Sequence, residues 1–106
     1  MVDLTVRRLL VDLEAPIERL WNGGDAFRTA WFNALSMSFP VGEQFFIDSV
    51  REGVKQLSPE QREAFAAEVA GFIGQEATHR RIHGLFNAHL ERQGLVNHWE
   101  VRARRR

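Results

Sequence analysis

Residues 72–83 read FIGQEATHRRIH, and they place one glutamate and two histidines where a helix would normally bury apolar side chains. Glu76, His79 and His83 are separated by three and then four residues. In a helix all three would therefore lie within about one-sixth of its circumference. This spacing is typical of a metal-ligand face, although neutral core histidines that donate to backbone carbonyls would also fit it.

The helix that carries this stretch has a well-defined start. In the sequence LSPEQ, residues 57–61, Ser58 suits the N-cap, Pro59 the first helical position and Gln61 the reciprocal position of a capping box. Gly94 suits the C-terminal stop. We therefore predict a helix over residues 58–94.

A second helix is predicted before it, over residues 25–57. The sequence WNGGD, residues 21–25, indicates a turn, and Asp25 can cap the helix that follows. Pro40 lies inside the helix, and we expect a kink there rather than a break, because the same stripe continues in phase on both sides. Around Glu43 at 100° per residue, this stripe contains Phe32, Ser36, Phe39, Phe46, Ile47, Val50, Val54 and Leu57.

Two long helices joined by a tight turn predict an all-α fold built on an antiparallel helical hairpin. Glu43 would lie roughly 21 Å before the turn and Glu76 roughly 27 Å after it, so the two carboxylates should face each other across the hairpin. Residues 1–24 are predicted to form an extended arm and turn, and residues 95–106 a basic tail. We interpret the whole chain, 1–106, as a single domain.

Composition excludes several classes of function. Fourteen basic and fourteen acidic residues cancel, so nucleic acid and anionic membrane are not expected as partners. The arginine-rich end, residues 102–106, is expected to be solvated. No apolar run reaches the roughly 18 residues that a membrane span needs, which favours a cytoplasmic protein. Because the chain has no cysteine, a metal would have to be held by nitrogen and oxygen.

Two carboxylates on apolar stripes need an explanation, because an unpaired buried carboxylate costs several kcal/mol. Glu43 could instead pair with Arg80 or Arg81. We favour a metal site because one Glu from one helix and a Glu-x-x-His pair from another match the ligand set of two-metal helical bundles. The predicted ligands are Glu43, Glu76 and His79. His83 is predicted either as a further ligand or as a hydrogen-bond donor to a ligand.

Three small polar residues, Asn33, Ser36 and Asn87, lie on or near the stripes and could orient ligands. His89 and His98 are expected at the surface. His89 projects more than about 120° away from Glu76 around the predicted helix, and His98 lies beyond Gly94. Carboxylates combined with imidazoles favour iron or manganese, with zinc possible.

Two blocks of sequence carry a resemblance to a known family. NALSMSFPVGEQFFIDSVR, residues 33–51, and FIGQEATHRRIHGLFNAHLERQG, residues 72–94, resemble the FPxGExFF and QExxHxxxH segments of a bacterial family of predicted metal-dependent hydrolases, placed among ferritin-like proteins. The resemblance implies a ferritin-like helical bundle. It also implies that Glu43, Glu76, His79 and His83 occupy the motif positions of that family.

Such a site needs two Glu helices and two Glu-x-x-His helices, and this chain has one of each. A two-fold homodimer would supply the other half and complete a four-helix bundle. Three hypotheses follow: a metal-dependent hydrolase that uses water activated by the metal, a di-iron oxidoreductase or ferroxidase, and a truncated helical interaction module without activity. No feature of the sequence indicates the substrate, the catalytic residues or any organic cofactor.

Overall fold

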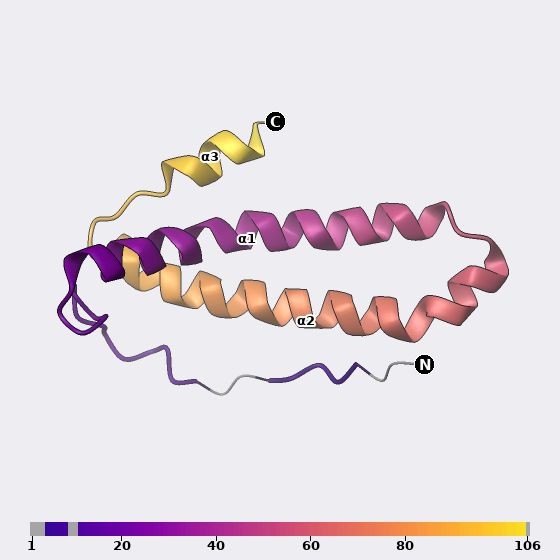
Figure 1. Ribbon diagram of the computed structural model, residues 1–106, viewed down its shortest axis with the longest axis horizontal. Coiled ribbons are helices and arrows are strands. Elements are labelled where there is room, and N and C mark those ends of the chain that lie inside the picture. Colours follow the sequence, from indigo (N-terminus) through magenta and orange to yellow (C-terminus); the bar gives the residue numbers. More distant parts are fainter. Residues whose placement is uncertain (1–3, 9–10, 106) are drawn as a thin grey trace.

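The fold is a long helical hairpin, as predicted. The computed structural model describes residues 4–8 and 11–105, with helix α1 spanning Ala26–Lys55, α2 Pro59–Arg92 and α3 His98–Arg104. Helices α1 and α2 lie side by side and antiparallel over most of their length, while α3 folds back against α1 (Figure 1). In the part of the chain that the structure describes, no helix combines the length and apolar character needed to cross a bilayer.

Helix α1 begins and continues as the sequence predicts. The Asp25 side chain accepts a hydrogen bond of 2.8 Å from the backbone N–H of Arg28, which satisfies one of the free donors of the first turn. Pro40 lies inside the helix, which runs past it as one element. The side chains of Glu43 and of the residues around it are therefore carried by one uninterrupted helix.

The turn between α1 and α2 is fixed at both ends. Ser58 and Gln61 form the predicted capping box, with N–H···O distances of 3.2 and 3.0 Å. The guanidinium of Arg62 donates to the carbonyls of Val54, Lys55 and Leu57 at the end of α1. Carbonyls at the end of a helix lack their usual donors four residues further along the helix, so Arg62 ties the start of α2 to the end of α1 and the turn. Sequence patterns alone do not indicate this role.

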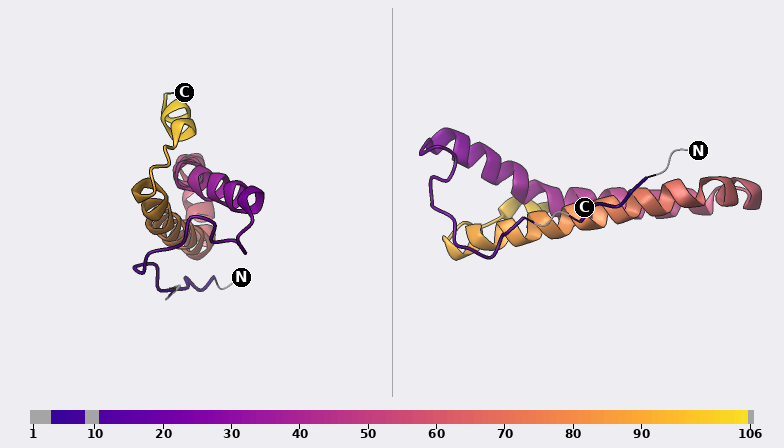
Figure 2. Two further views of the ribbon diagram at one scale, coloured as in Figure 1. Left: turned by 90° about the vertical axis from the view of Figure 1, so that its left-hand side faces the viewer. Right: turned by 90° about the horizontal axis from the view of Figure 1, so that it is seen from below.

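The described residues of the N-terminal arm, 4–8 and 11–18, are extended apart from a bend at 14–15, as expected, and run beside α2 in the same direction (Figures 1 and 2). Residues 1–3, 9 and 10 of the predicted arm lie outside the described part of the chain. Gly71 and Gly74 give it room: a Cβ at Gly71 would lie 2.5 Å from Leu4 Cβ, and one at Gly74 would lie 2.6 Å from Val6 Cγ2. The Gln75 side chain donates to the Thr5 carbonyl at 2.7 Å. The arm is therefore seated on the same stretch of α2 that carries the predicted ligands.

The basic tail contains a short helix, α3, that was not predicted from the sequence. Asn97 caps this helix by accepting from the Glu100 N–H at 3.1 Å, and its amide donates to the Met37 carbonyl of α1 at 2.6 Å. Arg104 pairs with Glu100 at 2.7 Å. Arg102, Arg104 and Arg105 are exposed, as expected, while Asn97 and the i, i+4 ion pair favour a helical backbone.

The interior of the hairpin contains more polar than apolar side chains. In the described residues the buried hydrophobic side chains are Ile47 and Leu90, whereas the buried polar ones are Thr29, Asn33, Ser36, Glu43, Asn87 and His89. Large apolar side chains are instead exposed along α1, including Phe27, Trp31 and Phe45 at 78%, 61% and 66%. The chain alone is thus not arranged around an ordinary apolar core.

We predict that Gly71→Ala releases the arm, whereas Gly84→Ala on the same helix does not. A methyl group at Gly71 collides with Leu4, but one at Gly84 meets no atom within 4 Å. Both substitutions gain the same helix propensity, about 1 kcal/mol. In limited trypsin digestion followed by mass spectrometry, Gly71→Ala should accelerate cleavage after Arg7, and Gly84→Ala should leave it unchanged. Equal cleavage rates in the two variants would contradict the seating of the arm.

Candidate metal centre

Three of the four predicted ligands form one group inside the hairpin. Glu43 of α1 and His79 and His83 of α2 each offer a ligand atom, and these atoms lie within 4.8 Å of one another. Oε1 of Glu43 is 2.8 Å from Nδ1 of His79, and Nε2 of His79 is 3.2 Å from Nε2 of His83. Antiparallel pairing of the helices therefore brings together residues that are far apart in sequence, in a group that could hold a divalent metal ion.

The Glu43 carboxylate is buried without a hydrogen-bond donor. Its side chain is 1% exposed, and in residues 4–8 and 11–105 no donor makes a hydrogen bond of acceptable geometry to either oxygen, the 2.8 Å contact with His79 included. Burial raises the pKa of Glu43; the charge of His79 opposes this rise, that of Glu76 adds to it, and Arg80 opposes it slightly. A buried anion of this kind requires a cation.

His83 is held in one tautomer by two neighbours. The Asn87 amide donates to the Ser36 carbonyl at 3.1 Å, so the Asn87 Oδ1 faces the Ser36 hydroxyl, which donates to it at 2.7 Å. With its single proton used, Ser36 Oγ must accept from His83 Nδ1–H at 2.8 Å. Burial, and then the charge of His79, lower the pKa of His83 and favour the neutral ring. Its Nε2 therefore presents a lone pair to the group.

The contacts of His79 cannot both be favourable without an additional positive charge. If neutral His79 donates from Nε2 to His83, its Nδ1 presents a lone pair to the Glu43 carboxylate only 2.8 Å away. If His79 is protonated on Nδ1 instead, the lone pair of its Nε2 faces the lone pair of His83 Nε2. Either an extra proton or a bound cation resolves this conflict, and a divalent cation would accept electron pairs from all three residues.

Phe39 forms an apolar wall against the two imidazoles. Its ring stacks on His83 with centroids 4.5 Å apart and an interplanar angle of 28°, and its centroid is 5.5 Å from that of His79. This contact limits ring rotation and keeps water from one side of the histidines. Electrostatic interactions inside the group are strengthened accordingly.

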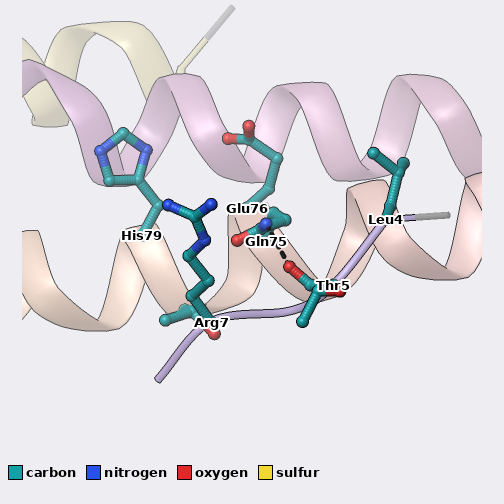
Figure 3. Close-up of a pocket in the computed structure, with 7 residues that line it drawn as sticks. Leu4, Thr5, Arg7, Gln75, Glu76 and His79 are labelled. Atoms are coloured by element: carbon teal, nitrogen blue, oxygen red, sulfur yellow. Dashed lines mark hydrogen bonds between the residues drawn. The ribbon is translucent and has the colours of Figure 1, made fainter. Parts of the chain in front are cut away.

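Glu76, the fourth predicted ligand, lies beside the group but is not part of it. Its side chain is directed toward α1, and Arg7 reaches from the arm toward Glu76 and His79 (Figure 3). These residues line an open recess of about 510 Å³ together with Leu4, Thr5, Gln75 and Thr78. After burial, which is the main cause, the negative charge of Glu76 also contributes to the raised pKa of Glu43.

The arginine alternative for Glu43 is not realised in the described part of the chain, where its partner within ion-pair distance is His79. Arg80 donates instead to the side chain of Gln44. Among the small polar residues, Ser36 and Asn87 orient His83, as anticipated. Asn33 does not contribute to the group, because its Oδ1 accepts from the Trp21 indole N–H at 2.8 Å.

The expectation that His89 lies at the surface is wrong. His89 is 4% exposed, its Nε2 contacts the Leu13 carbonyl, and its Nδ1 lies 2.9 Å from the Arg92 guanidinium. The face of α2 opposite Glu76 is covered there by the arm, which helical periodicity alone does not predict. His98 is exposed, as expected.

A comparison with protein families gave one match that spans the fold and the site. The model of a family described as predicted metal-dependent hydrolase matches residues 5–106, which include all three helices and Glu43, Glu76, His79 and His83. Comparisons with curated proteins and with solved structures gave no match.

We predict that Glu43→Gln stabilises the metal-free protein. Because the folded-state pKa of Glu43 is raised, this group contributes stability at low pH that is lost as the pH rises through its folded-state value. A neutral glutamine of the same shape removes this loss. At neutral pH and with chelator present, thermal unfolding should show a gain on the order of 1 kcal/mol. Glu63→Gln, at an exposed position of α2, is the control; a destabilised Glu43→Gln variant would contradict the assignment.

Proposed function

Because the chain belongs to the family of predicted metal-dependent hydrolases, we propose that it is a metal-dependent hydrolase whose ion is held by Glu43, His79 and His83. The observation that carries this proposal is the Glu43 carboxylate, buried without a hydrogen-bond donor and facing two imidazoles. A divalent cation supplies the charge that this arrangement lacks. The donor set fits iron or manganese, and zinc is also compatible.

The protein residues have distinct roles in this proposal. Glu43 neutralises part of the charge of the ion, and His83 is kept neutral and correctly oriented by Ser36 and Asn87. His79, half exposed, forms the boundary between the group and the open recess. The bound ion would supply Lewis-acid polarisation of a substrate oxygen and activation of water for hydrolysis. Glu76 would supply a further carboxylate beside the ion.

We propose further that a second copy of the chain completes the site. The ligand set is half of the ferritin-like two-metal arrangement, which needs two Glu helices and two Glu-x-x-His helices. An isologous interface would place the same ligands on both sides of a two-fold axis. The exposed aromatic residues of α1 support this assembly, since a hairpin with so few buried apolar side chains gains stability by covering them.

The metal proposal predicts one ion per chain, lost when the group is disrupted. Isothermal titration of chelator-treated protein with Mn²⁺, Fe²⁺ under anaerobic conditions, and Zn²⁺ should give saturable binding. His79→Gln, His83→Gln and Glu43→Gln should each weaken it by at least about 100-fold, because each removes a direct ligand. His98→Gln and Glu63→Gln are matched controls on exposed positions. Wild-type protein that binds no ion would contradict the enzyme proposal and favour a helical interaction module without activity.

The same donor set serves oxygen chemistry, so the reaction class needs its own test. With iron loaded anaerobically, oxygen consumption on exposure to air would favour the di-iron oxidoreductase or ferroxidase alternative. Hydrolysis of an aryl ester under anaerobic conditions, lost in His83→Gln and retained in His98→Gln, would support the hydrolase. Measuring both on one preparation separates the two reactions.

The dimer proposal predicts that Phe46→Arg makes the protein monomeric. Phe46 is 48% exposed and lies one turn after Glu43, so it would be near a two-fold axis through the site. Leu85, 45% exposed, lies on α2, about 180° around that helix from Glu76, and provides the control Leu85→Arg. Sedimentation velocity should give a dimer for the wild type and Leu85→Arg and a monomer for Phe46→Arg. A monomeric wild type at micromolar concentration, with metal present, would disprove the assembly.

A further inference from the structure

An apolar pocket adjoins the metal group on the side away from the open recess. It is an open pocket of about 260 Å³, lined mainly by apolar and aromatic side chains of the arm, α1 and α2. Its polar lining comes from two residues, Ser36 and His83. Both already belong to the group or its support, so the pocket has no polar recognition chemistry of its own.

His83 joins the pocket to the group. One ring is at once a wall of the pocket and a member of the Glu43–His79–His83 set, and Phe39, stacked on that ring, lines the same pocket. Anything that fills the pocket is therefore within contact distance of the imidazole proposed to hold the ion. Ligand sites are commonly concave and apolar, with a few convergent polar groups.

We infer that this pocket binds an aromatic or branched hydrocarbon group of the substrate while the reacting polar bond lies at the metal group. The inference rests on the proposed hydrolase function and adds a substrate class to it. An apolar cavity of about 150 Å³ binds benzene. A pocket of 260 Å³ accommodates a larger group, about the size of two fused rings. The substrate is then an uncharged molecule at this end, because no Asp, Glu, Lys or Arg is among the residues that line the pocket.

Trp21 makes this occupancy measurable without any activity. It lines the pocket, in edge contact with Phe86 at a centroid distance of 5.4 Å, whereas the other two tryptophans, Trp31 and Trp99, are 61% and 51% exposed. A Trp31→Phe/Trp99→Phe background leaves Trp21 as the single emitter. The probe is 1-bromonaphthalene, whose bromine quenches indole fluorescence on contact.

In that background 1-bromonaphthalene should quench Trp21 saturably, with one site per chain. Leu35, 41% exposed, lines the pocket, and Leu35→Lys introduces a charge there that should weaken binding by at least about tenfold. Leu85, 45% exposed on α2, does not line the pocket, so Leu85→Lys is the matched control and should bind as the parent does. Ile82→Phe, which narrows the pocket, is a second variant and should also weaken binding.

Quenching that does not saturate, or that is equal in Leu35→Lys and Leu85→Lys, would overturn the inference. Loss of quenching at concentrations where the chain is dimeric would also overturn it, since a second copy would then occupy the pocket. A Zn²⁺ titration of the same samples tests the metal proposal separately. Zinc binding without saturable quenching would contradict the inferred substrate class but not the proposed metal site.

Discussion

The buried Glu43 carboxylate is the constraint on which the rest of the structure depends. It lies in the middle of a 30-residue helix and is almost completely removed from water, yet no described side chain donates a hydrogen bond to it. An anion in that position opposes folding unless a positive charge accompanies it. The two histidines facing it are the groups that can share a cation with it, which connects the stability of the hairpin to the occupancy of the site.

The helices are held around this carboxylate by hydrogen bonds rather than by a large apolar interface. Ser36 and Asn87 bond to each other twice across the hairpin, and the same hydroxyl fixes His83. The contacts that join α1 to α2 thus also orient a candidate ligand. Polar networks of this kind impose one geometry when every member is satisfied, and here the unsatisfied member is Glu43.

Much of the fold could be predicted from the sequence because its signals are local. Ser58, Pro59 and Gln61 mark a helix start through contacts within one turn, and Asp25 and Gly94 act in the same way. The proximity of His79 and His83 could be predicted because they lie one turn apart on one helix face, whereas Glu43 joins them only through the pairing of α1 with α2. The burial of His89, the seat of the arm on Gly71 and the helix α3 could not, because each depends on contacts between segments distant in sequence. The tautomer of His83 likewise follows only from three-dimensional contacts with α1.

The distribution of polarity in the chain links the proposed metal binding to the proposed self-association. The candidate ligands and the side chains that support them occupy the hairpin interior, so the aromatic residues of α1 are left on the outside. Within the proposed function, an ion that binds only the folded hairpin adds its binding free energy to folding. A second copy that covers the exposed aromatics stabilises the same folded state. Each event then strengthens the other by the same coupling free energy, and the interior can keep a reactive polar site without a conventional apolar core.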